Sequence, residues 1–91
     1  MLFVAFATPR PGTLQQRLAR RLQWRYPEGV RPVAEYWLQG SEYDVVSIVE
    51  ADSVAPIMAT LAAWDDLFDF RVAPAVTADE GLRLAQQMAK S

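Results

Sequence analysis

A carboxylate near the end of a strongly apolar segment is the first candidate for chemistry in this sequence. Glu50 follows a β-branched run and stands one place before the predicted end of a strand at Ala51. A carboxylate at a strand end beside a cavity can act as a general base if burial raises its pKa. The alternative is that Glu50 caps backbone N–H groups or forms an ion pair with Arg71 or Arg31, which is the commoner role of such a group. Glu50 is therefore the catalytic candidate, with ion pairing as its other interpretation.

Aromatic residues near the same strands suggest a wall for a flat ligand. The side chains that can stack on such a ligand are Tyr36, Trp37, Tyr43 and Trp64. Packing in the core is the alternative, and it is favoured for Trp64, which falls on the apolar face of a predicted helix. Glu35, next to these aromatics, needs a charged partner if it faces the interior. The predicted ligand-binding residues are Glu35, Tyr36, Trp37, Glu50 and Arg71.

The composition excludes several kinds of site. The chain has no His and no Cys, and Asn is also absent, so the commonest general base, the commonest metal ligand and every thiol are missing. The formal net charge is −2 at pH 7, which gives no general attraction to nucleic acid or to an anionic membrane. We therefore expect no metal, no cofactor, no nucleic-acid partner and no membrane partner.

A basic stripe on the first predicted helix has two interpretations. Arg17, Arg20, Arg21 and Arg25 lie opposite the leucines of that helix. They can form a surface for an anion or an acidic partner, or an ordinary solvated face. The negative net charge favours the solvated face. The preceding Pro-Arg-Pro-Gly segment lacks the pattern of a phosphate-binding loop.

The length of 91 residues is that of one domain. The apolar opening from Met1 to Ala7 is too short to span a bilayer and lacks the basic start of a signal peptide. We therefore expect a soluble, cytoplasmic protein formed by residues 1–91.

The first half of the chain predicts three strands and a helix. Residues 2–7 are rich in Phe, Val and Leu and form a strand, closed by two prolines and a glycine. Thr13 and Gln16 have the spacing of a capping box for a helix that ends near Tyr26, where Pro27 stops it. Residues 30–38 and 43–51 form a hairpin through a turn at residues 39–42.

The second half predicts a helix, a strand and a final helix. Asp52 and Ser53 offer an N-cap for a helix that ends near residues 65–66. Residues 68–76 alternate clearly between apolar and polar side chains, as a strand does. Thr77 and Glu80 form a second capping box for a short amphipathic C-terminal helix.

This order of elements is the α+β, ferredoxin-like βαββαβ arrangement, with a four-stranded antiparallel sheet and two helices on one face. Both faces of the sheet are apolar, since Val4 and Phe3 point to opposite sides, as do Ile48 and Val49. Two helices cannot cover both sides, so we expect a homodimer through the second sheet faces. Charged residues there would form ion pairs between subunits. The alternative is that the C-terminal helix folds back over this face.

Several segments resemble the dimeric α/β-barrel superfamily. They are residues 1–4, 9–13, 35–37, 43–52, 64–67 and 70–77. Within that superfamily the chain is most similar to a small uncharacterised bacterial family, a domain of unknown function, over nearly its whole length. The resemblance implies two sheets packed face to face around an apolar cavity that often holds a small organic or aromatic ligand.

The chemistries of characterised relatives can be compared with the residues present here. The haem-binding and haem-degrading members and the small YCII-like members use a His, and this chain has none. The cofactor-free quinol monooxygenases use an Asn with Trp residues, of which only the Trp residues are present. The resemblance therefore implies that two chains assemble face to face, but it does not imply a particular activity.

Three functions remain open from the sequence. The first is a homodimeric module that binds a small apolar or aromatic molecule between its sheets. The second is a cofactor-free monooxygenase or isomerase with Glu50 as the base and Trp37 in the wall. The third is a structural dimerisation domain whose barrel is filled by its own side chains.

Overall fold

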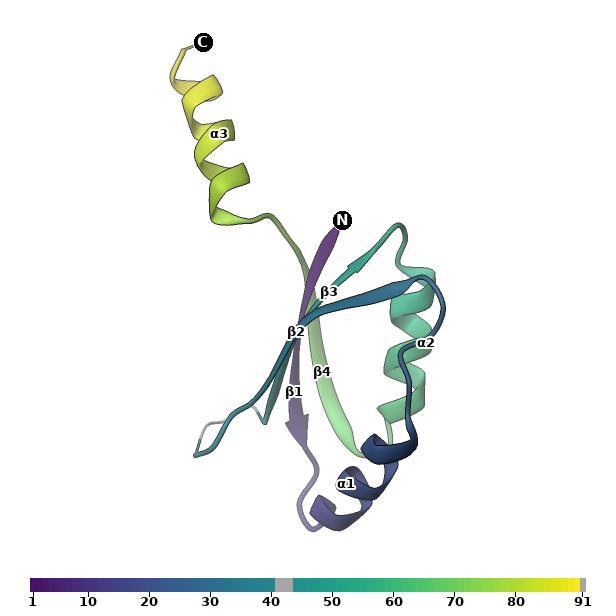
Figure 1. Cartoon of the computed structure of the whole chain (residues 1–91). Coiled ribbons are helices and arrows are strands. Elements are labelled where there is room, and N and C mark those ends of the chain that lie inside the picture. Colours follow the sequence, from purple (N-terminus) through teal and green to yellow (C-terminus); the bar gives the residue numbers. More distant parts are fainter. Residues whose placement is uncertain (41–43, 91) are drawn as a thin grey trace.

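The computed structural model describes residues 1–40 and 44–90, and its elements follow the predicted order (Figure 1). They are β1 (Leu2–Pro9), α1 (Leu14–Gln23), β2 (Val30–Trp37), β3 (Val45–Ala51), α2 (Ala55–Trp64), β4 (Phe68–Ala75) and α3 (Ala78–Ala89). The predicted start of the third strand at Tyr43 and part of the preceding turn lie outside the described residues.

The four strands form one antiparallel sheet in the order β2-β3-β1-β4. Phe3 of β1 lies between Val49 of β3 and Pro74 of β4. Helices α1 and α2 lie on the same side of this sheet (Figure 1). The fold is therefore α+β and ferredoxin-like, as the sequence predicts.

The strand register confirms that both faces of the sheet carry apolar side chains. On the helix side, Phe3 pairs with Val49, and on the other side Val4 pairs with Ile48. We call the second side the open face, because α1 and α2 do not cover it. Helix α3 continues past the end of β4, away from the rest of the chain (Figure 1). The alternative in which α3 folds back over its own sheet is not what the structure has.

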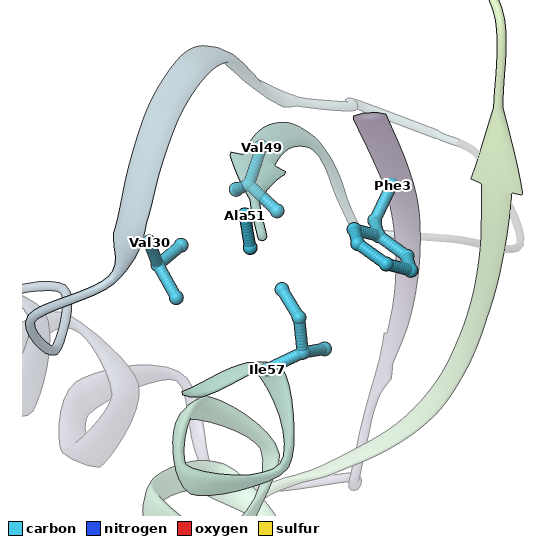
Figure 2. Close-up of a cluster of buried hydrophobic side chains, with 5 residues drawn as sticks. All are labelled: Phe3, Val30, Val49, Ala51 and Ile57. Atoms are coloured by element: carbon cyan, nitrogen blue, oxygen red, sulfur yellow. The ribbon is translucent and has the colours of Figure 1, made fainter. Parts of the chain in front are cut away.

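The core lies between the sheet and the two helices in two clusters. One contains Phe3, Val30, Val49, Ala51 and Ile57, which converge from three strands and α2 (Figure 2). The other contains Ala7, Trp64, Leu67 and Phe68. The buried residues of β1 and β3 lie on the helix side of the sheet, so the period of two in these strands decides which side chains can be buried.

The ends of α1 and α2 differ from the predictions. Thr13 does not cap α1 with its side chain; its hydroxyl donates to the Arg10 carbonyl at 2.7 Å and accepts from Arg17 Nε at 3.0 Å. Helix α1 ends at Gln23 rather than near Tyr26, because Trp24 is extended and packs inward. Helix α2 starts after Val54, so Asp52 and Ser53 are not its N-cap.

Helix α3 starts as predicted. The Thr77 hydroxyl accepts a hydrogen bond from the backbone N–H of Glu80 at 3.0 Å. Two acidic residues in its first turn, Asp79 and Glu80, lie at the positive end of the helix dipole. None of the helices in the described part of the chain is long and apolar enough to cross a membrane.

Candidate ligand-binding pocket

A pocket of about 190 Å³ opens between the helix side of the sheet and helices α1 and α2. Its lining is mostly apolar, and aromatic rings contribute much of it. The aromatic residues are Phe3, Trp24, Tyr26, Trp37, Trp64, Phe68 and Phe70. The pocket is therefore formed within one chain, whereas the sequence led us to expect a cavity between the sheets of two chains.

The aromatic rings form a connected wall. Trp24 packs edge-on against Tyr26, with ring centroids 4.6 Å apart, and against Trp64 at 5.8 Å. Trp64 in turn packs edge-on against Phe68 at 5.8 Å. Trp64 is 6% exposed, which confirms its predicted place in the core. Trp37, by contrast, is 49% exposed and lies where the pocket opens to solvent.

The carboxylate of Glu35 is the polar centre of the pocket. Its Oε1 accepts from the Tyr26 hydroxyl at 2.8 Å and from Arg21 Nη2 at 3.4 Å. Its Oε2 accepts from Trp37 Nε1 at 2.7 Å and from Arg21 Nε at 3.3 Å. Glu35 therefore fixes the orientation of two aromatic rings that line the pocket, and the expected charged partner of Glu35 is Arg21 of the same chain.

The protonation of Glu35 and Tyr26 follows from these contacts. Burial alone would raise the pKa of Glu35, but hydrogen bonds from Trp37, Tyr26 and Arg21 together outweigh it and hold that pKa below its ordinary value. Burial and the bond to Glu35 raise the pKa of Tyr26 to about 12. At neutral pH Glu35 is therefore an anion and Tyr26 a neutral donor, so neither is suited to act as a base.

Arg17 and Arg21 of α1 line the pocket, which corrects the expectation of a solvated stripe for these two residues, whereas Arg20 forms its ion pair at the surface. Arg17 Nη1 binds Asp44 Oδ2 at 2.7 Å, and Arg20 Nη1 binds Asp66 Oδ1 at 2.7 Å. The guanidinium groups of Arg17, Arg20 and Arg21 also lie 5.3–5.7 Å from the ring centroids of Phe68, Trp64 and Trp24.

The physical reason is that carboxylates and aromatic rings distant in sequence offer these arginines both an ion pair and a cation–π contact. Leu14 and Leu18 of α1 line the pocket beside these arginines, whereas Leu22 is 88% exposed. Arg25 is exposed, as expected.

The charges that line the pocket balance one another. Arg17 is paired with Asp44, and Arg21 is paired with Glu35. Among the lining residues that the structure describes, no net charge remains to attract an ionic ligand. The lining therefore matches a neutral molecule with an apolar body and hydrogen-bonding groups.

The structure brings two of the five predicted ligand-binding residues into the pocket. Glu35 and Trp37 share the helix side of β2. Tyr36 lies on the open face, where it pairs with Val46.

Glu50 and Arg71 also lie on the open face. Glu50 Oε1 accepts from Arg31 Nη2 at 2.8 Å, so the ion-pair alternative for Glu50 is confirmed. Arg71 pairs with Phe6 across β1 and β4. Within one chain, Glu50 and Trp37 therefore do not belong to one site.

Sequence reasoning did not identify Trp24, Tyr26, Arg17 and Arg21 as site residues. The signal for Trp24 and Tyr26 is that both lie within the three residues before the helix-breaking Pro27. Large aromatic side chains bury much apolar area when they pack inward. The two arginines carry no comparable signal, because their partners are distant in sequence.

A metal site has no support in the described residues. Within residues 1–40 and 44–90, no three acidic side chains gather closely enough to hold a metal ion.

The role of Glu35 predicts a pH-dependent stability. Because the pKa of Glu35 is lowered on folding, the stability from its ionised form is present above the unfolded-state pKa and is lost as pH falls through the folded-state pKa. Glu35→Gln is expected to cost about 1–3 kcal/mol of unfolding free energy at pH 7, since Arg21 loses its charged partner. Urea unfolding from pH 7 down to pH 3 measures this.

The matched control for that series is Glu28→Gln, which removes an exposed carboxylate. The difference between wild type and Glu35→Gln should shrink as pH falls, while Glu28→Gln should follow wild type at every pH. A constant difference across this range would contradict the role assigned to Glu35.

The fold and the pocket together define a ferredoxin-like α+β domain with an aromatic pocket between its sheet and its helices. The chain belongs to the family described as Domain of unknown function (DUF3303), whose sequence model matches residues 1–89. The predicted likeness to an uncharacterised domain family is thereby confirmed over nearly the whole chain. No curated protein and no solved structure matched the chain significantly.

Proposed function

We propose that this protein binds a small neutral aromatic molecule in the pocket between its sheet and its helices. The observation that best supports this proposal is the aromatic wall around the hydrogen-bonded carboxylate of Glu35. Trp37 lies at the mouth of the pocket, and Glu35 holds its ring in place by accepting a hydrogen bond from it. Apolar walls with a few oriented polar groups are the usual composition of small-molecule sites.

The volume of the pocket limits the size of the ligand. A cavity of about 150 Å³ binds benzene in a well-studied engineered case. The pocket here measures about 190 Å³ and is partly open. A molecule with one ring, or with two fused rings, fits in the pocket. Any further part of a larger molecule would extend into solvent past Trp37.

The balanced charges decide which substituents the ligand carries. A sulfonate or carboxylate would have to break the pair of Arg17 with Asp44 or of Arg21 with Glu35, at the cost of leaving a carboxylate unpaired. A hydroxyl group can instead hydrogen-bond at the rim. The proposed ligand class is therefore neutral, such as a phenol or a naphthol.

The assembly belongs to the same proposal: two chains pack through their open sheet faces. The apolar side chains on that face include Leu2, Val4, Phe6, Val46 and Ile48. Soluble monomers rarely leave such a continuous apolar surface exposed. Each chain then keeps its own pocket on the outer side of its sheet.

An enzymatic role for Glu50 has little support in this arrangement. Glu50 is paired with Arg31 and lies on the opposite side of the sheet from the pocket. The carboxylate that does line the pocket, Glu35, has donors on both of its oxygens. We therefore favour binding over turnover.

A fluorescence titration tests the binding proposal. We expect 2-naphthol to quench the tryptophan emission saturably and 2-naphthalenesulfonate to have at least about tenfold lower affinity, equivalent to about 1.4 kcal/mol. Native mass spectrometry of the purified protein, with organic extraction, shows whether a small molecule is retained. Equal affinity for both probes, or no saturable binding of either, would contradict the proposal.

A further inference from the structure

Helix α3 has an apolar side that nothing in residues 1–40 and 44–90 of its own chain covers. Its apolar and glycine residues all fall on one side of the helix, and its charged and amide residues fall on the other. The apolar side consists of Ala78, Gly81, Leu82, Leu84, Ala85, Met88 and Ala89. Leu82 is 64% exposed and Met88 is 75% exposed.

Such a helix requires a partner surface. An isolated helix of 12 residues is marginal in water, so the amphipathic pattern of α3 indicates that it packs against something. Its polar side carries Asp79, Glu80, Arg83 and Lys90, whose charges cancel, and Glu80 and Arg83 pair with each other. A membrane-surface helix is typically basic on that side. The balanced charge of α3 favours a protein surface.

The proposed sheet-to-sheet dimer identifies the occupant as a second copy of this chain. Four strands of about eight residues give the open face a footprint of about 500 Å², from strand spacings of about 4.8 Å and rises of about 3.4 Å per residue. Helix α3 has a footprint of about 180 Å². If α3 of each chain packs on the other chain, each helix enlarges the contact by about that footprint and buries an apolar side that is otherwise exposed.

If α3 folded back onto its own sheet, it would leave much of the open face uncovered. A helix of this length covers about 180 Å², which is less than half of the open face, and α3 points away from the sheet beyond the end of β4 (Figure 1). We propose that α3 is an exchanged arm: in the homodimer its apolar side packs against the second chain. This inference rests on the sheet-to-sheet dimer of the proposed function and is independent of the pocket.

A pair of charge substitutions tests the arm. Met88→Glu and Gln86→Glu add the same charge to α3 on opposite sides, and both residues are exposed in the single chain. Because a symmetric dimer contains each contact twice, Met88→Glu is expected to raise the dimer dissociation constant at least about 100-fold. Gln86→Glu should leave it within about threefold of wild type. Sedimentation across a dilution series gives both constants, and equal effects would overturn the inference.

A photocrosslink identifies which chain receives the arm. p-Benzoylphenylalanine is placed at position 88 of the full chain, the sample is irradiated, and products are separated under denaturing conditions. A covalent product of twice the 10.2 kDa chain mass supports the exchanged arm. A crosslink within one chain, or no crosslink in a dimeric sample, overturns it while leaving the sheet dimer intact. A wild-type protein that is monomeric at all concentrations overturns both and leaves the pocket proposal to its own test.

Discussion

A glutamate in place of Ile48 is expected to convert the proposed dimer into monomers. Ile48 lies in β3, between Val4 of β1 and Ala34 of β2, at the centre of the open face. In the dimer this change buries two like charges without partners, so we expect the dissociation constant to rise about 1000-fold, equivalent to about 4 kcal/mol. Analytical ultracentrifugation over a range of concentrations measures the constant.

The control for Ile48→Glu is Gln16→Glu, which adds the same charge to the exposed side of α1. It should leave the dimer unchanged. Because the pocket lies on the other side of the sheet, the Ile48→Glu monomer should still bind 2-naphthol. A variant that stays dimeric would place the interface elsewhere and contradict the sheet-to-sheet packing.

Two tryptophans are expected to separate stability from binding. Trp64 is buried and contacts both Trp24 and Phe68, so Trp64→Ala should lower the free energy of unfolding by about 3–5 kcal/mol. That loss is a large part of the 5–15 kcal/mol typical of a domain. Denaturant unfolding at one fixed protein concentration measures it, since dimerisation makes stability depend on concentration.

Trp37 is the matched partner in this comparison. Because it is half-exposed at the pocket mouth, Trp37→Ala should cost less than about 1 kcal/mol of stability and should weaken the binding of 2-naphthol about tenfold. Trp37→Ala is therefore expected to affect binding more than stability, whereas the large effect of Trp64→Ala is on stability. If Trp37→Ala bound the probe as wild type does, the aromatic mouth would have no role in recognition.

Local patterns predicted most of the fold. The alternation in residues 68–76 places Phe70 and Val72 on the helix side and Arg71 on the open face, as found. The spacing of Thr77 and Glu80 predicted the start of α3. Such signals depend on neighbours a few residues apart, which a single sequence displays directly.

The candidate site was only partly predictable. Glu35 and Trp37 were identified from their position on one strand, and the structure places both in the pocket. Glu50 was assigned to the same site because it also stands near a strand end, but its place in the register puts it on the other face, beside Arg31. The position of a residue near a strand end does not determine which face of the sheet it lies on. Whether two residues on different strands share a face depends on the strand register.

The sequence by itself determined the order of elements, the two apolar sheet faces and the exclusion of His and Cys chemistry, because each depends on residue type or short-range period. Only the tertiary structure decided which residues of α1 line the pocket. Its leucines have the spacing of a buried stripe, but Arg17 and Arg21 line the pocket beside Leu14 and Leu18, and Asp44 and Glu35 pair with these arginines. Those carboxylates come from distant segments. Their proximity arises only when the sheet and the helices assemble, so the pocket that they border is a property of the folded chain.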